Sequence, residues 1–91
     1  HMLHDPWLTR WLPVLKEAAG TRPVLEIGCG MGADTSTLVA AGLRVVAFDI
    51  SPVSVAATRL RVPAAKVVCQ DARSPFPVEP GQAGAVVASL S

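Results

Sequence analysis

The stretch VLEIGCGMGAD at residues 24–34 decides the fold of this chain. An apolar run contains an acid near its end, three alternating glycines follow, and a helical segment then begins. This order predicts a strand, a tight turn and a helix N-terminus, the arrangement in which backbone N–H groups meet a ligand. Each glycine loses extra backbone entropy on folding, so three within five residues indicate unusual dihedral angles or a close approach to a ligand. We therefore predict a ligand site at this turn.

Composition narrows the class of protein. The chain has 91 residues, enough for one domain with a modest core, and 51% of them are hydrophobic but only 4% aromatic. Eight basic and seven acidic residues give a net charge of +1, so charge offers no argument for nucleic acid or a membrane surface as partner. No apolar run reaches the roughly 18 residues of a membrane span, and the first residues lack the basic region and the long apolar core that we expect of a signal peptide. We expect a cytoplasmic protein.

Further expectations concern the first residues and the two cysteines. His1 and Met2 read as the remnant of a cleaved tag, so residues 1–4 are a tail and residues 5–91 a single domain. Cys29 and Cys69 lack metal-type spacing, and we expect both to be reduced thiols. Cys29 lies within the glycine turn, where we expect its side chain to pack rather than to act as a nucleophile.

A helix is predicted over residues 6–19. Asp5 and Pro6 form an N-cap followed by proline at the first helical position, and apolar residues then recur at helical spacing. Pro13 lies inside this pattern and predicts a kink, or a break into two helices. We expect Trp7 and Trp11 to form a hydrophobic lid on one face of a sheet.

Four apolar runs follow this helix, and two helical segments lie between them. The predicted strands cover residues 24–27, 44–49, 66–70 and 83–90, and the predicted helices cover residues 34–41 and 52–61. The proline-rich segment 74–81 is a predicted loop. Strands alternating with helices at this spacing indicate a parallel sheet with right-handed crossovers. The fourth strand would lie at an unpaired apolar edge.

An acid occurs at or next to the carboxyl end of each of the first three strands: Glu26, Asp49 and Asp71. In an open parallel sheet these strand ends line one crevice, where ligands bind. Three acids beside glycine N–H groups favour a ligand with hydroxyl and amino groups. Asp49 follows Gly32 by 17 residues, about where an acid accepts hydrogen bonds from a ribose.

The glycine spacing separates the nucleotide-binding classes. A dinucleotide fingerprint is G-x-G-x-x-G and a P-loop needs a lysine after its glycines, whereas residues 28–32 read G-C-G-M-G. This acid-x-G-x-G-x-G pattern resembles the first motif of the class I S-adenosylmethionine-dependent methyltransferases. Residues 48–51 (FDIS) resemble the second motif of that family and residues 70–72 (QDA) the third. Residues 84–89 (GAVVAS) are similar to the fourth, although the usual acid near Gly84 is absent.

The resemblance implies an α/β fold: a three-layer Rossmann-like arrangement of about four parallel strands in the order 3-2-1-4, with helices on both faces. It also implies that S-adenosylmethionine or S-adenosylhomocysteine binds, with Glu26 and the turn on the methionine part and Asp49 on the ribose. Ile50 would contact the adenine ring and Asp71 the adenine amino group. The full set of implied cofactor-binding residues is Glu26, Gly28, Cys29, Gly30, Gly32, Asp49, Ile50, Asp71, Ala72 and Ser89.

Members of this family have seven strands, so the resemblance also implies that the chain is an N-terminal part of an incomplete methyltransferase fold. We expect weak cofactor binding without turnover, and the residues identify no catalytic base and no metal site. An alternative is a structural or assembly unit that forms a homodimer through its fourth strand. A lesser alternative is a fragment of a nicotinamide-dependent oxidoreductase. The methyl acceptor has no signature in the sequence.

Overall fold

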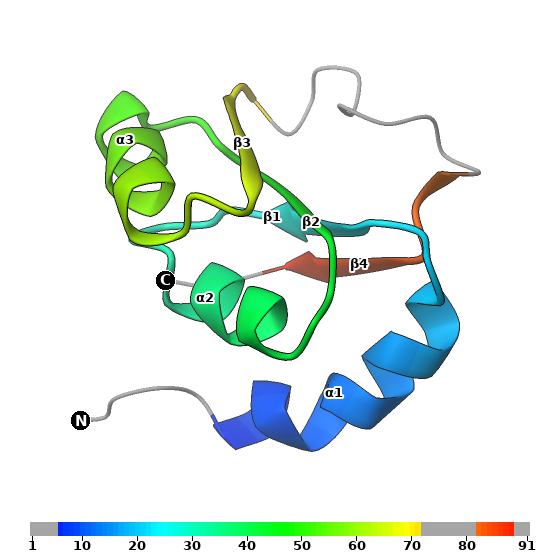
Figure 1. Cartoon of the computed structure of the whole chain (residues 1–91). Helices are drawn as coiled ribbons and strands as arrows, with labels where there is room; N and C mark the ends of the chain where they lie inside the picture. Colours follow the sequence, from blue (N-terminus) through cyan, green and yellow to red (C-terminus); the bar gives the residue numbers. More distant parts are fainter. Residues whose placement is uncertain (1–5, 72–81, 89–91) are drawn as a thin grey trace.

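A computed structural model describes residues 6–71 and 82–88 (Figure 1). These residues form three helices and four strands. The elements are α1 (Pro6–Ala19), β1 (Val24–Ile27), α2 (Ala33–Ala40), β2 (Val45–Asp49), α3 (Pro52–Arg61), β3 (Lys66–Cys69) and β4 (Ala85–Ala88). Among the described helices, none combines the length and the apolarity that crossing a bilayer requires. The predicted loop 74–81 lies outside the described residues, as do the last positions of the predicted fourth strand.

The four strands form one parallel sheet in the order β3-β2-β1-β4. Strand β1 lies inside the sheet, where Val24 pairs with Val45 of β2 on one side and with Ala85 of β4 on the other. Both inner strands are apolar nearly throughout, which is typical of parallel strands buried on both faces. The predicted Rossmann-like class and strand order are confirmed.

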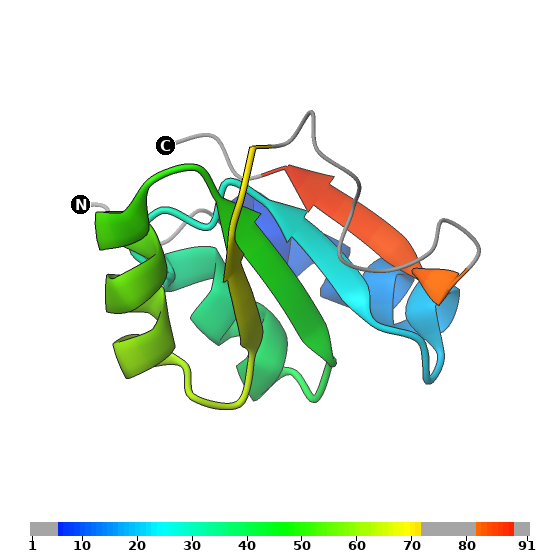
Figure 2. The same ribbon diagram turned by 90° about the horizontal axis from the view of Figure 1, so that it is seen from above.

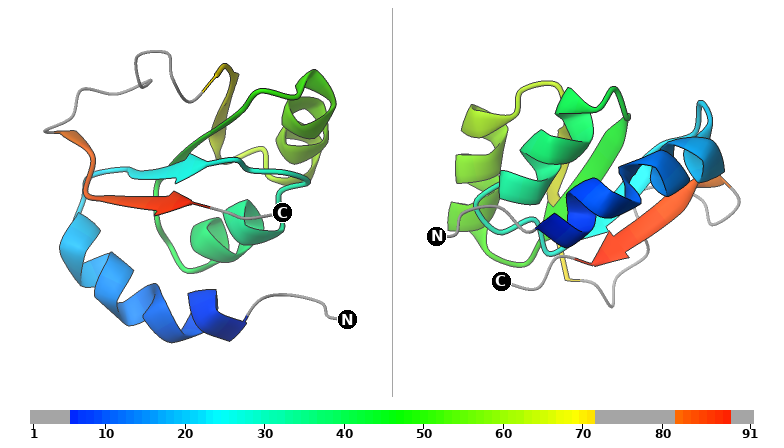
Figure 3. Two further views of the ribbon diagram at one scale, coloured as in Figure 1. Left: turned by 180° about the vertical axis from the view of Figure 1, so that it is seen from behind. Right: turned by 90° about the horizontal axis from the view of Figure 1, so that it is seen from below.

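The three helices lie together on one face of the sheet (Figures 2 and 3). A single apolar core joins Leu8 of α1, Leu38 of α2 and Val55 of α3 to alternate strand residues such as Val45 and Val67. The connections from β1 to β2 and from β2 to β3 step across the sheet in the same direction. Right-handed crossovers in one direction place both helices on one face. The expected helices on the second face are therefore not found among the described residues, which form two layers rather than three.

The second face of the sheet is also apolar. Leu25 and Phe48 point to it, since they alternate with the core residues on their strands, and both are buried. Val86, on the outer strand β4, is 54% exposed on the same face. The apolar side chains on this face are therefore buried on the inner strands and exposed on β4, at the edge of the described sheet.

Helix α1 is one continuous helix with Pro13 inside it, so the expected break into two helices is not found. Leu8 is fully buried, and Leu12 and Leu15 pack against the core. These leucines occupy successive turns of one helix face, and Trp11 lies off that face with 50% of its surface exposed. The expectation that Trp11 covers the sheet is therefore wrong, and the side chain of Trp7 lies outside the described residues.

The end of α1 approaches the start of β4 very closely. The N–H of Gly84 donates to the carbonyl of Pro23 at 2.9 Å. A β-carbon placed on Gly84 would lie 2.3 Å from the Cα of Ala19 and 2.8 Å from its Cβ. No side chain fits there without moving backbone, so the acid that the resemblance leads one to expect near Gly84 would have no room at that position.

We predict that Gly84→Ala lowers the free energy of unfolding by about 2–3 kcal/mol, because overpacking at a backbone contact forces the backbone apart. The measurement is urea unfolding followed by circular dichroism. Gly42→Ala is the comparison variant, because Gly42 has open space around it and only its φ of 89° opposes a β-carbon, a cost of roughly 1 kcal/mol. Gly84 has no such positive φ, so its larger loss would come from the contact with Ala19. Equal losses in the two variants would contradict the close approach of α1 and β4.

Candidate functional site

The turn between β1 and α2 has three glycines in the left-handed region of backbone space. The φ values of Gly28, Gly30 and Gly32 are 75°, 55° and 90°. Residues with a β-carbon adopt such values only at a steric cost, so each of the three positions favours glycine. This conformation is the reason for the alternating glycines seen in the sequence.

Strand β2 holds the turn in place. The carbonyl of Phe48 accepts from the N–H groups of Gly28 and Cys29 at 2.8 and 3.2 Å. The carboxylate of Asp49 accepts from the N–H of Gly30 through Oδ2 at 3.0 Å. Three successive amides of the turn are thereby fixed by the end of the neighbouring strand.

Asp49 also organises the segment that follows it. Its second oxygen, Oδ1, accepts from the N–H of Ser51 at 2.9 Å, and Ser51 caps helix α3 through the N–H of Ser54. The side chain of Asp49 remains partly exposed. Each carboxylate oxygen has two lone pairs, so Asp49 retains acceptor capacity toward a ligand.

Glu26 lies beneath the turn and not at its surface. It is fully buried and accepts a hydrogen bond from the hydroxyl of Thr35, a fully buried residue of α2. Thr35 thus ties the first acid of the motif to the helix that begins at the turn. Direct contact between Glu26 and the methionine part of a cofactor stays a prediction, and the described cavity does not include Glu26 in its wall.

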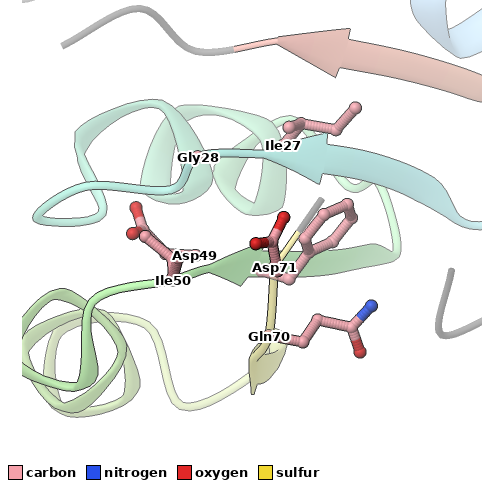
Figure 4. A pocket seen from close by; sticks show the side chains of 7 residues that line it. Ile27, Gly28, Asp49, Ile50, Gln70 and Asp71 are labelled. Atoms are coloured by element: carbon pink, nitrogen blue, oxygen red, sulfur yellow. The ribbon is translucent and has the colours of Figure 1, made fainter. Parts of the chain in front are cut away.

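A cavity of about 220 Å³ opens at the carboxyl ends of β1, β2 and β3 (Figure 4). The residues that line it are Ile27, Gly28, Phe48, Asp49, Ile50, Gln70 and Asp71. Four of the predicted site residues thus meet in one place: Gly28, Asp49, Ile50 and Asp71. In Figure 4 the carboxylates of Asp49 and Asp71 both point toward the β1 side of the cavity. Ala72 and Ser89 lie outside the described residues.

Three residues of the cavity wall were not predicted from the sequence. Ile27 and Phe48 lie on the second face of the sheet at the ends of their strands, and Gln70 precedes Asp71. The alternation of side chains along β1 and β2 is the signal that places Ile27 and Phe48 on one face. Gln70 follows β3 directly, and its N–H donates to the carbonyl of Asp49 at 3.0 Å, which sets the end of β3 beside that of β2.

Glycines 30 and 32 act behind the cavity wall rather than in it. Gly30 is held by Asp49, and Gly32 is the N-cap of α2, which has no side-chain cap. The first amides of an α-helix have no partner within the helix, and they carry the positive end of its dipole. The N-terminus of α2 is therefore suited to an anionic group of a ligand.

Cys29 and Cys69 are both free cysteines in the structure. Cys29 is buried, and this burial raises the pKa of its thiol above the ordinary value, with smaller increases from the charges of Asp49 and Glu26. A protonated, buried thiol is a poor nucleophile, which agrees with a packing role. Cys69 is exposed on β3. Within residues 6–71 and 82–88 no group of three potential metal-ligating side chains comes together.

Comparison with known proteins agrees with this geometry. A protein-family profile described as "Methyltransferase domain" matches residues 24–91, which is more than half of the chain. No curated protein matches the chain at a significant level.

Solved structures share the fold. The S-adenosylmethionine-bound amino pentose methyltransferase CalS10 from Micromonospora echinaspora matches with a TM-score of 0.74 at 22% identity, over 93% of this chain and 36% of that one. The CcbJ methyltransferase from Streptomyces caelestis matches with a TM-score of 0.75 at 22% identity, over 92% of this chain and 36% of that one. A functionally unknown protein from Deinococcus radiodurans R1 is 29% identical, with a TM-score of 0.69 over 94% of this chain and 41% of that one.

The chain thus spans little more than a third of the length of the solved relatives. The part that it spans contains the glycine turn and the strand ends described above. The family profile matches most of the chain, and the strand order and the glycine turn agree with it. The chain therefore belongs to the methyltransferase domain family, in its class I S-adenosylmethionine-dependent branch.

Proposed function

We propose that the chain binds S-adenosylmethionine, or its product S-adenosylhomocysteine, in the cavity at the carboxyl ends of the strands. One observation carries the proposal: two carboxylates line the same cavity as Gly28 of the glycine turn. Asp49 ends β2, and Asp71 comes just after the neighbouring strand β3. A nucleoside with ribose hydroxyls and an exocyclic amino group presents donors that match two such carboxylates.

Different cavity residues bind different groups of the adenosine part. Asp49 accepts from the ribose hydroxyls with the acceptor capacity that Gly30 and Ser51 leave. Asp71 accepts from the adenine amino group. Ile50 is 67% exposed at the cavity and offers an apolar surface to the adenine ring. Burial of this side chain by a flat ring is favourable because it removes apolar surface from water.

The methionine part meets a different environment. The uncapped N-terminus of α2 suits the cofactor carboxylate, because its amides and dipole attract an anion. The buried carboxylate of Glu26 lies beneath the turn, where its charge favours the ammonium and sulfonium groups even without contact. The charges of the site thus match both ends of an amino acid zwitterion.

Weak binding without methyl transfer by this chain alone is part of the proposal. A cavity of about 220 Å³ is smaller than the roughly 300–1,000 Å³ of sites that enclose a drug-sized ligand, so it covers only part of the cofactor. The bound cofactor supplies an electrophilic methyl group on a sulfonium. Transfer then depends on holding the acceptor in line with that methyl group, and no described residue is assigned to this task.

We also propose a second candidate of another class, an assembly unit in which two copies pair through β4. The observation that favours it is the position of β4 at the end of the described sheet, with Val86 more than half exposed. An outer strand with apolar side chains is a template for pairing with another chain. Cofactor binding and such pairing are compatible.

We predict that Asp49→Ala weakens the binding of S-adenosylhomocysteine by at least about tenfold, since a hydrogen bond to a charged group contributes roughly 1.5–3 kcal/mol. Isothermal titration calorimetry with millimolar ligand measures the affinity. Glu17→Gln is the matched control, because it removes an exposed carboxylate on α1. No heat with the wild-type chain, or equal affinity of the Asp49→Ala variant, would contradict the proposal. Displacement of the ligand by NADH would instead favour the nicotinamide alternative.

We predict that Ile50→Ala weakens the same binding by about 1 kcal/mol, roughly fivefold, because the adenine ring loses part of its apolar contact. The exposed side chain contributes little to the core, so the midpoint of thermal unfolding stays unchanged. Leu60→Ala on α3 is the control, since Leu60 is 84% exposed and lies outside the cavity wall. Calorimetry that gives both variants the same affinity would remove Ile50 from the site.

We predict that the chain forms a dimer whose fraction rises with protein concentration, and that Val86→Lys shifts it toward the single-chain mass. A charge on an outer strand opposes edge pairing because pairing would desolvate it. Multi-angle light scattering over a range of concentrations measures the mass. A single-chain mass of the wild-type chain at every concentration would rule out the second candidate.

A further inference from the structure

Thr58 is a fully buried polar residue of α3 that belongs to none of the recognised motifs. Its hydroxyl donates to the carbonyl of Gly30 at 3.0 Å and lies 3.4 Å from the Sγ of Cys29. Helix α3 follows β2, so this contact joins the turn after the first strand to the helix after the second. Both partners of the hydroxyl, the Gly30 carbonyl and the Cys29 sulfur, lie in the glycine turn.

Gly30 is therefore held on both sides by side chains. Asp49 accepts from its N–H and Thr58 donates to its carbonyl. The first bond fixes the peptide plane before Gly30, and the second fixes the plane after it. Because a glycine has a wide choice of dihedral angles, these two bonds select the φ of 55° observed here.

Packing at Thr58 brings α3 against the turn a second time. A β-carbon placed on Gly32 would lie 3.2 Å from Cγ2 of Thr58, 3.3 Å from its Cα and 3.3 Å from its Oγ1. The threonine thus contacts the turn with both its methyl and its hydroxyl group. A valine would keep nearly the same shape and lose only the hydrogen bond, so the two contributions are separable.

We propose that Thr58 is a positioning residue for the cofactor turn, acting through the Gly30 carbonyl. Its hydroxyl orients the peptide between Gly30 and Met31, and through it the start of α2 whose amides face the cofactor carboxylate. This inference rests on the proposed cofactor binding and adds a residue to it. A threonine that only filled space would contribute to stability but not to the conformation of Gly30.

The test compares the wild-type chain with Thr58→Val and Thr58→Ser by two measurements. The first is amide hydrogen exchange at Gly30 by NMR, which needs no ligand, and the second is the affinity for S-adenosylhomocysteine by calorimetry. Thr58→Val leaves the bond from the Gly30 N–H to Asp49 in place but removes the bond that fixes the next peptide plane. The turn should then open more often, so that exchange at Gly30 speeds up and binding weakens, each by roughly three- to tenfold. Thr58→Ser keeps the hydroxyl and should restore both to within about twofold of the wild type.

Thr9→Val is the matched control, because Thr9 is an exposed threonine of α1, outside the glycine turn and helix α2. Wild-type values in Thr58→Val, or equal effects of Thr58→Val and Thr58→Ser, would overturn the role of the hydroxyl. If Thr58→Val fails to fold, Thr58→Ala and Thr58→Ser form the pair that differs by the hydroxyl alone. Absence of binding by the wild type would refute the proposed function, and amide exchange at Gly30 would still decide the role of Thr58.

Discussion

The hydrogen bond from the N–H of Gly30 to the carboxylate of Asp49 is the constraint on which the site depends. It joins the turn that follows β1 to the last residue of β2. The bond, and with it the conformation of the turn, can therefore form only when these two strands pair in register. Ile27 pairs with Phe48 in that register, which brings Asp49 level with the start of the turn. A shift of one residue would send this carboxylate to the opposite face of the sheet. The register between β1 and β2 therefore determines both the fold of the sheet and the geometry of the ligand site.

Much of the fold was predictable because its signals are local. Apolar runs that end near an acid, proline at helix starts and alternating glycines are properties of short segments, and they predicted a parallel sheet with Gly28, Asp49 and Asp71 at its carboxyl edge. The strand order and the place of Ile50 were implied by the resemblance of these segments to the methyltransferase motifs. The close approach of Gly84 to Ala19 and the contact of Thr58 with Gly30 were not predictable. Each joins segments far apart in the sequence, and no periodicity encodes such a pair.

The expectation for Trp11 failed, and the helices expected on the second face are not found among the described residues, for a related reason. Trp11 is a large apolar residue in an amphipathic helix, but its angular position, and not its size, decides that it faces solvent. The arrangement of the helices depends on the direction in which successive crossovers move across the sheet. Both outcomes depend on how a whole helix is oriented against the sheet. The types of single residues in the sequence do not specify that orientation.

The strand order has a consequence for how the chain acquires its structure. Val24 of β1 meets Val45 soon after both are made, but its other neighbour is Ala85, near the end of the described chain. During synthesis, one edge of β1 therefore stays unpaired until residue 85 has left the ribosome, about sixty residues after β1 itself. Pairing between such distant segments is slow because a long loop must close first. The glycine turn, whose bonds come from β2 and α3, can form well before the sheet that contains it is complete.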